Sequence, residues 1–202
     1  IRFHDNPCFK KTKGKGRELT AHDVAYSLIR IFDPAIECKN LNFVANIKGA
    51  MAFRQARQND KNTPYAIEGI QVVDRYTLRL TLSKPIPELP YLLAMPLGSV
   101  ISKEAVVYYK NDLKFNPVGT GPWLLTKAFK PRTTKFIFRK NPDYHSCFPE
   151  IASKRYKHME SYVGKKLPLV DELHIEIITA PSASWLKFKN GELDIAYWQA
   201  SE

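Results

Sequence analysis

Residues 17–34 read RELTAHDVAYSLIRIFDP, and the pattern in this stretch predicts an amphipathic helix. Thr20 is a residue type that caps helices, and Asp23 stands three residues later, where it can complete a capping box. Apolar side chains then recur at the spacing of one helix face, at Val24, Leu28, Ile29 and Phe32. Pro34 ends the pattern, because the residue before a proline avoids helical backbone angles. We therefore expect a helix that buries one apolar side in a folded core.

Strand and helix patterns alternate through the rest of the chain. Alternation of apolar and polar residues predicts strands near 70–72, 78–82, 123–129, 134–140, 173–177 and 193–197, and residues 1–5 also read as part of a strand. Helical patterns lie within 42–58, near 88–95, from Ser102 to Tyr109 and from Ser182 to Asn190. These elements follow no regular βαβ order, so the expected fold class is α+β or mixed α/β.

The composition is that of a globular protein. The chain has 202 residues, of which 44% are apolar and 25% charged, which fits one large or two small domains. It contains no run of about 18 apolar residues, so no membrane-spanning helix is expected. Cys8 and Cys38 lie on either side of the first predicted helix. They either form a disulfide, if the compartment is oxidising, or remain free thiols.

The net charge of +11 is unevenly distributed along the chain. Residues 113–166 hold 12 Lys and Arg but only 3 Asp and Glu, whereas residues 167–202 hold 2 and 6. A basic excess favours nucleic acid, an anionic surface or an acidic partner, and it is also found on ordinary solvated surfaces.

Two local patterns support a nucleic-acid- or phosphate-binding domain as the alternative function. The run from Lys10 to Arg17 combines cations with glycines and could hold phosphates. Basic residues also alternate with aromatic ones that could stack on bases, at Phe129, Phe136 and Phe138. However, Phe136 and Phe138 have the spacing of a half-buried strand, which explains the same pattern without a ligand.

Motifs of catalysis and metal binding are mostly absent. Ser184 and Lys187 have the S-x-x-K spacing of some serine acyl-transfer enzymes, but no S-D-N or K-T-G accompanies them. A metal site could use His145, Cys147 and His158, but the paired Cys-x-x-Cys spacing of structural zinc sites is missing. We therefore expect no enzymatic activity, no metal and no cofactor.

The order of short motifs along the chain resembles that of the extracytoplasmic solute-binding proteins of family 5, the oligopeptide- and dipeptide-binding components of ABC importers. The helix motif of residues 17–30, with Phe3-His4-Asp5 before it, is similar to a signature of that family. The later motifs follow in family order: IEGI at 67–70, LSKPIP at 82–87, SKEAV at 102–106, NPVGTGPW at 116–123, RKNPDY at 139–144, LPLVDE at 167–172 and NGELD at 190–194. The resemblance leaves out only 37–63 and 146–166.

This resemblance implies a periplasmic-binding-protein-like fold of class II, in which two lobes close on a ligand. Residues 1–112 would form most of a small β-rich domain, and residues 113–202 part of the first main lobe, ending near the hinge between lobes. The chain would be an internal fragment, because its start lacks the features of a signal sequence and its end reads like mid-chain. The family's location is the periplasm or the outer face of the cytoplasmic membrane.

The implied function is capture of an extended peptide or similar solute and its delivery to a membrane permease, by a monomer that binds no nucleic acid. Family members also carry nickel, haem, opines or sugars, so peptide is the default ligand. We expect the cleft to be lined by Tyr197, Trp198 and Gln199, which precede the hinge, and secondarily by Asn42 and Phe43. The Val118–Gly121 turn is expected to be structural, its glycines allowing positive φ or close backbone approach. The basic segment 146–166 is expected to touch a partner or anionic headgroups.

Overall fold

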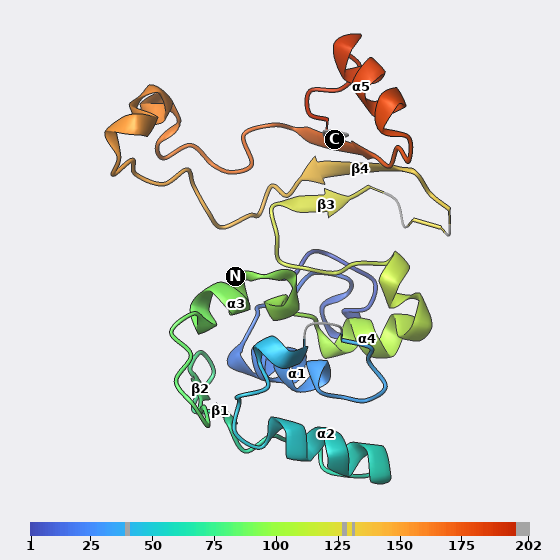
Figure 1. Ribbon diagram of the computed structural model, residues 1–202, viewed down its shortest axis with the longest axis vertical. Helices are drawn as coiled ribbons and strands as arrows, with labels where there is room; N and C mark the ends of the chain where they lie inside the picture. The colour runs from blue at the N-terminus through green and yellow to red at the C-terminus, as the bar shows by residue number, and fades with distance from the viewer. Residues whose placement is uncertain (39–40, 127–128, 131, 197–202) are drawn as a thin grey trace. The chain divides into compact units, whose positions relative to one another are not determined.

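The computed structural model describes residues 1–38, 41–126, 129–130 and 132–196 (Figure 1). The chain folds as two compact units, residues Ile1–Gly121 and Pro122–Glu202, which divide inside the predicted Gly/Pro turn. No helix in the described ranges has the length and apolar character needed to cross a membrane.

The first unit is built mainly from short helices around a hairpin. Its helices are η1 (Lys10–Thr12), α1 (Ala21–Ile31), η2 (Leu41–Phe43), α2 (Ala50–Asn59), α3 (Leu89–Ala94), η3 (Pro96–Gly98), α4 (Lys103–Tyr109) and η4 (Lys110–Phe115). Helix α1 confirms the prediction from residues 17–34. The Asp23 carboxylate accepts the Thr20 backbone N–H at 2.9 Å, so the arm of the capping box that Asp23 supplies is present.

The main core lies between α1, α2 and the hairpin. Leu28, Ile29 and Phe32 are buried as their spacing predicted, and they pack against Val44, Ile47, Phe53, Ile67 and Ile70. Phe32 and Val44 are fully buried, and burial of side chains of this size stabilises the fold by about 1.5–3 kcal/mol each. Strands β1 (Ile70–Val72) and β2 (Leu78–Leu80) pair antiparallel, with Ile70 opposite Leu80, which confirms the predicted hairpin.

A second cluster joins the start of the chain to α4 and the Gly/Pro turn. Its buried members are Phe3, Cys8, Phe9, Ala105 and Val118. Ser102, itself fully buried, caps α4 by accepting the Ala105 N–H at 3.1 Å, which confirms the cap predicted at this position.

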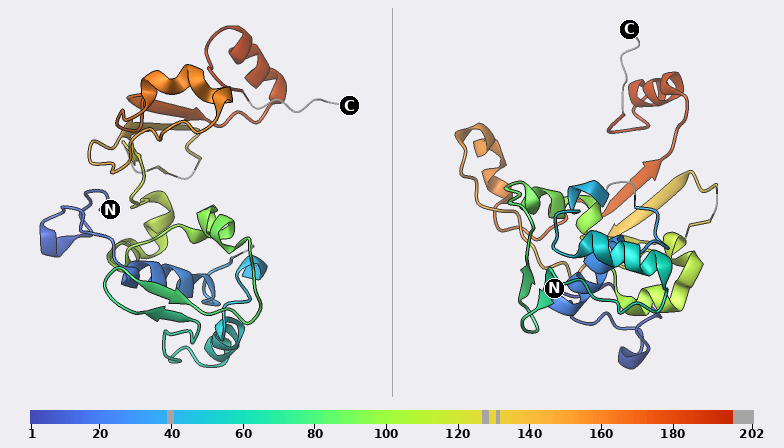
Figure 2. Two further views of the ribbon diagram at one scale, coloured as in Figure 1. Left: turned by 90° about the vertical axis from the view of Figure 1, so that its left-hand side faces the viewer. Right: turned by 60° about the horizontal axis from the view of Figure 1, so that its bottom comes forward.

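The second unit is a three-stranded antiparallel sheet in the order β3 (Trp123–Leu125), β4 (Lys135–Lys140) and β5 (Glu172–Glu176). These strands run side by side in the views of Figure 1 and Figure 2. Two further helices are η5 (Lys154–Tyr162), in the long connection between β4 and β5, and α5 (Pro181–Lys189). Gly191, with φ of 74°, follows the end of α5, where glycine readily adopts the left-handed conformation.

Two strand predictions are wrong in the described residues. Residues 193–196 form no strand, and Tyr197 lies outside the described residues. At the start of the chain only an isolated bridge between Arg2 and Glu18 is present instead of a strand. Residues 193–196 keep the alternating pattern but pair with no neighbouring strand in the described residues, and a strand forms only where its backbone groups find partners. At the start of the chain the backbone is paired, because the Phe3 N–H donates to the Arg17 carbonyl and the Leu19 N–H to the Ile1 carbonyl, but this pairing is too short to form a strand.

Candidate functional site

The predicted cleft residues are placed only in part. Tyr197, Trp198 and Gln199 lie outside the described residues. Asn42 and Phe43 both belong to η2, where the Asn42 side chain is exposed and the following Val44 is fully buried. The structure therefore places Asn42 and Phe43 together on one turn.

The chain leading to Tyr197 borders an open apolar pocket on the second unit. This pocket has a volume of about 360 Å³ and is lined by β5, α5 and the residues up to Ala196. Its apolar side chains are well exposed, Ile175 by 44% and Ile195 by 87%. Among the described residues from 122 onward, Asn141 alone is buried, so this unit displays apolar surface that it does not itself cover.

The sheet register separates an apolar face from a charged one. Phe136 pairs with Ile175 and Phe138 with Leu173, so these four side chains share one face. Arg139, opposite Glu172, lies on the other face. Phe129 packs edge-on against Phe136, with ring centroids 5.4 Å apart. The aromatic pattern that suggested base stacking is thus the apolar face of a half-buried sheet, as its alternation also predicted.

The cations of β4 are paired with acids of the second, acidic part of the sequence. Arg139 Nε lies 3.0 Å from Glu172 Oε1, and Lys135 Nζ lies 3.7 Å from Glu176 Oε1. Lys140 also pairs with Asp171, just before β5. The hydrogen bonds from His174 and Arg139 lower the pKa of Glu172, so it remains an anion at neutral pH.

Ser184 and Lys187, the possible catalytic pair, both lie on α5, and Lys187 is bound to a carboxylate. Lys187 Nζ donates to both carboxylate oxygens of Glu176, at 3.0 Å each, and this bond lowers the pKa of Glu176. Lys187 is thus engaged with Glu176 in an ion pair, whereas activation of Ser184 would require a desolvated amine beside the serine.

The suggested metal ligands do not assemble in the described part of the chain. No group of three His, Cys, Asp or Glu side chains there could hold a metal ion. The His145 ring packs against Tyr144 at 4.7 Å, and Cys147 forms a backbone bridge with Lys166. Cys8, Cys38 and Cys147 are free thiols, so the structure contains no Cys8–Cys38 disulfide.

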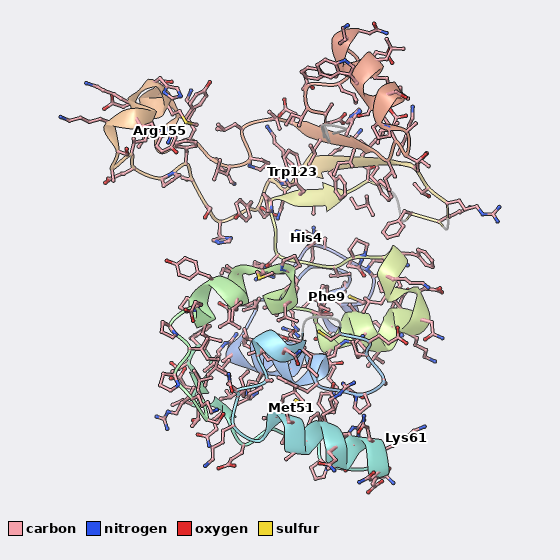
Figure 3. The ribbon with its side chains drawn as sticks, viewed as in Figure 1. His4, Phe9, Met51, Lys61, Trp123 and Arg155 are labelled. Atoms are coloured by element: carbon pink, nitrogen blue, oxygen red, sulfur yellow. The ribbon has the colours of Figure 1, made fainter. Side chains whose placement is uncertain are left out.

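The Cys147–Lys166 bridge closes the base of the basic segment 146–166, which carries η5. The Phe148 N–H donates to the Lys165 carbonyl at 2.8 Å, and the Phe148 and Tyr162 rings lie 5.9 Å apart. Arg155, labelled in Figure 3, is exposed on η5. The segment is thus a closed loop with basic side chains at its surface.

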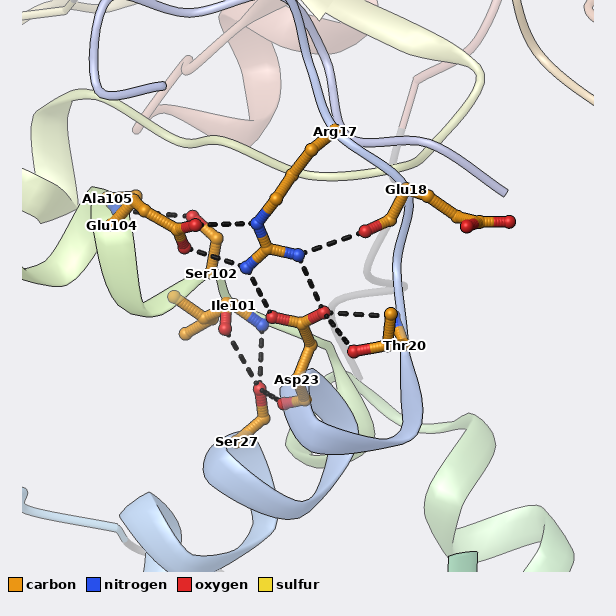
Figure 4. Close-up of polar contacts among 9 residues, drawn as sticks. All are labelled: Arg17, Glu18, Thr20, Asp23, Ser27, Ile101, Ser102, Glu104 and Ala105. Carbon is orange, nitrogen blue, oxygen red and sulfur yellow. Dashed lines mark hydrogen bonds and ion pairs between the residues drawn. The ribbon is translucent and has the colours of Figure 1, made fainter. Parts of the chain in front are cut away.

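Arg17 forms the densest polar cluster of the first unit (Figure 4). Its guanidinium pairs bidentately with Glu104, at 2.6 and 2.7 Å, and with Asp23, at 2.8 and 2.7 Å. A fifth bond joins Nη1 to the Glu18 carbonyl at 3.0 Å, so all five N–H groups of Arg17 are used. Burial opposes ionisation of Asp23, but the bonds from Arg17 and Thr20 outweigh it and lower the Asp23 pKa.

The Val118–Gly121 turn is fastened to the start of the chain by His4. The His4 backbone N–H donates to the Gly119 carbonyl at 2.8 Å, and His4 Nε2 lies 2.9 Å from the Gly121 carbonyl. Burial lowers the pKa of His4, although the bond to Gly121 opposes this shift. The prediction that the glycines of this turn allow positive φ or close backbone approach is wrong. Neither Gly119 nor Gly121 has a positive φ, and a Cβ at Gly119 would meet nothing closer than 3.9 Å.

Sequence reasoning did not identify the Arg17 cluster or the role of His4. Arg17 and Glu104 are separated by 87 positions, and His4 and Gly121 by 117. The available signal was local: Arg17 stands next to the capping box, and the Phe3-His4-Asp5 motif resembles a family element.

Comparison with known proteins identifies the family. Residues 2–202 match the model of the bacterial extracellular solute-binding proteins, family 5, middle region. Di/tripeptide-binding protein 2 of Pseudomonas aeruginosa (strain UCBPP-PA14) is 29% identical over 203 residues, which cover 97% of this chain and 31% of that protein. The dipeptide-binding protein of Escherichia coli (strain K12) is 28% identical over 202 residues, which cover 96% of this chain and 31% of that protein.

Solved structures show the same fold. OppA of Burkholderia pseudomallei superposes with a TM-score of 0.68 at 22% identity, covering 91% of this chain and 31% of that one. Listeria monocytogenes OppA bound to peptide gives a TM-score of 0.67 at 22% identity, with 91% and 31% covered. The chain thus spans about a third of the length of these proteins, and the expected periplasmic-binding-protein-like fold is confirmed. The chain belongs to the bacterial extracellular solute-binding proteins of family 5.

Proposed function

We propose that the protein is the solute-binding component of an ABC importer, which captures an extended peptide or similar solute and delivers it to a membrane permease. The family match over residues 2–202 carries this proposal. The relatives named above for di/tripeptide and dipeptide binding support peptide as the ligand class. They are named for binding, and the proposed function involves no catalysis. The proposed location is the periplasm or the outer face of the cytoplasmic membrane, where the protein would act as a monomer.

The proposed mechanism is capture between two lobes. An extended peptide offers a row of backbone donors and acceptors, so main-chain hydrogen bonds supply affinity while roomy pockets accept different side chains. Closure of the lobes about a hinge excludes water and strengthens those bonds. Recognition through the backbone explains how one receptor can accept many sequences.

Residues 1–112 are proposed to form most of the small domain, and residues 113–202 part of the first main lobe. The division of the structure within the 116–123 turn supports two domains in this region. The exposed apolar side chains around β5 and α5 support the second assignment, since a lobe that continues beyond these residues would cover them.

Tyr197, Trp198 and Gln199 are proposed to line the cleft, with Asn42 and Phe43 as weaker candidates. The pocket bordered by Ile195 and Ala196 supports the first group, because Tyr197 follows Ala196 directly in the sequence. The exposure of Asn42 on η2 is consistent with the second. Aromatic side chains suit such a role, because they offer a large apolar surface with a polar tip.

Thermal unfolding with a peptide library tests this function. The protein in its full-length form should gain stability with di- and tripeptides, by about 2.7 kcal/mol at a ligand concentration of 100 times Kd. Equimolar mixtures of the constituent amino acids serve as the control and should give no comparable gain. Absence of any shift across a diverse library would exclude peptide as the ligand class.

Calorimetric titration of variants tests the cleft residues. Trp198→Ala should weaken peptide binding by about tenfold or more, because a buried aromatic contact is lost. Tyr91→Ala is the matched control, since Tyr91 is 78% exposed in the first unit. Residues 1–202 alone should bind weakly or not at all, because half of the cleft would be missing. Submicromolar affinity of this chain alone would contradict the two-lobe mechanism.

A further inference from the structure

A second pocket, on the first unit, is larger than the one beside β5. It has a volume of about 830 Å³ and lies between η1, the first turns of α1 and the exposed side of α4. Sites for small molecules usually have volumes of about 300–1,000 Å³. Because its walls come from one compact unit, the pocket depends on no other part of the chain for its shape.

The charged groups at the back of this pocket are already satisfied. Asp23 and Glu104 reach its wall, but both are paired with Arg17, whose N–H donors are all in use (Figure 4). Burial raises the pKa of the Cys8 thiol, which therefore stays protonated at neutral pH. The back wall thus offers no free charge, either to attract a cation or to repel an anion.

The rim of the pocket carries three lysines. Lys10, Lys11 and Lys103 are exposed and line the opening. Lys10 Nζ lies 5.8 Å from the centre of the Tyr108 ring. In the described residues, none of the three forms an ion pair with an acid. Three ammonium groups around one opening favour a negatively charged ligand.

The remaining walls are mostly apolar and aromatic, with Thr12 and His22 as their polar members. Phe9, labelled in Figure 3, is buried at the wall, and Tyr26 is half-buried. On α4, Val107 is 62% exposed and Tyr108 45% exposed. Such surface gains free energy when an apolar ring system covers it.

We propose that this pocket binds a small organic anion with an aromatic body, an aromatic carboxylate being the simplest case. The lysines at the rim hold the carboxylate, and Phe9, Val107 and Tyr108 contact the ring system. The site shares no residue with the proposed peptide cleft, and it belongs entirely to the first unit. Its occupation therefore does not require a peptide ligand.

The probe for the test is 1-naphthaleneacetate, with the neutral 2-(1-naphthyl)ethanol as the matched control ligand. Backbone-amide NMR shifts of residues 1–202 are followed during titration. The acetate should shift amides of η1, α4 and the start of α1, and should bind about tenfold or more tightly than the alcohol, because only the acetate attracts the lysines. Equal affinity of both ligands, or no saturable shift, would overturn the proposal.

Charge reversals locate the site. Lys11→Glu combined with Lys103→Glu should weaken binding of the acetate by about tenfold or more, since attraction becomes repulsion. Lys61→Glu combined with Lys84→Glu is the matched control, because both lysines are exposed in the same unit and neither lines the pocket. Circular dichroism checks that all variants are folded. Equal weakening by both pairs would show non-specific charge attraction and contradict the site.

The full-length protein completes the test. When it is saturated with a peptide, it should still bind the acetate with unchanged affinity. Competition between peptide and acetate would place the acetate in the peptide cleft and refute a separate site. Loss of acetate binding in the full-length form would show that the pocket is covered there, which also refutes the proposal.

Discussion

Arg139 and Glu172 face each other across the β4–β5 pair, with Nε 3.0 Å from Oε1. The two residues come from oppositely charged stretches of the sequence. Arg139 belongs to the basic stretch 113–166, and Glu172 belongs to the acidic stretch 167–202. The fold pairs these two stretches as neighbouring strands. Part of the basic excess is therefore compensated by ion pairs between the strands of the sheet.

This pairing predicts that the protein has no functional affinity for nucleic acid. A fluorescein-labelled single-stranded oligonucleotide should show no saturable anisotropy change at ~150 mM salt, because contacts with phosphates are weak once counterions screen them. The paired double reversal Arg139→Glu with Glu172→Arg keeps the ion pair and serves as a control. Tight binding that weakens steeply with salt would instead support the nucleic-acid alternative.

The Arg17 cluster should be a major source of stability in the first unit. Asp23→Asn removes one carboxylate from Arg17 and weakens the cap on Thr20, so the free energy of unfolding should fall by about 2–3 kcal/mol. Urea denaturation measures the change. Asp112→Asn, at an exposed position, should stay within about 0.5 kcal/mol of the parent. Equal stability of the two variants would contradict the role of the cluster.

The same cluster predicts sensitivity to acid. The folded-state pKa values of Asp23 and Glu104 are both lowered, from 3.8 and 4.5 respectively. Their stabilisation is therefore complete above these values and is lost as the pH falls through the lowered ones. Urea midpoints measured from pH 6 to pH 3 should decline, and the decline should be shallower in Asp23→Asn.

His4 predicts a second, milder dependence on pH. Its folded-state pKa lies below 6.5, so protonation favours the unfolded chain. Stability should be unaffected above pH 6.5 and should fall as the pH drops from there through the lowered pKa. His4→Gln can still donate to the Gly121 carbonyl. This variant should show a smaller change in melting temperature between pH 7 and pH 5.5 than the parent. His22→Gln, at an exposed position, should retain the slope of the parent.

Gly16 should tolerate no side chain. A Cβ at this position would lie 1.8 Å from the Phe3 carbonyl oxygen, so Gly16→Ala must displace the backbone and should destabilise the fold by about 3 kcal/mol or more. Gly119→Ala is the matched control, because its Cβ would meet nothing closer than 3.9 Å, and it should change stability by less than about 1 kcal/mol. Thermal unfolding of both variants checks the difference.

Local signals predicted most elements of the fold. The cap and apolar spacing predicted α1, Ser102 predicted the start of α4, and alternation predicted both the hairpin and β4. The prediction failed at residues 193–196, because a strand also requires a neighbour that its own sequence does not encode. It failed at the first residues of the chain because their pairing with residues 17–19 is limited to one bridge. The proposed cleft residues 197–199 lie outside the described residues, so for them the sequence remains the only guide.

The sequence by itself determined the family, from the order of short motifs along the chain. It also determined the helix caps and the alternation of the strands, because these depend on residues close together in the chain. Only the tertiary structure decided that Arg17 meets Glu104, that His4 holds Gly121 and that Arg139 faces Glu172. These contacts join residues that are far apart in sequence, and they form only when the packed core brings the segments together. The pocket rimmed by lysines on the first unit has the same origin, since three separate segments build its walls.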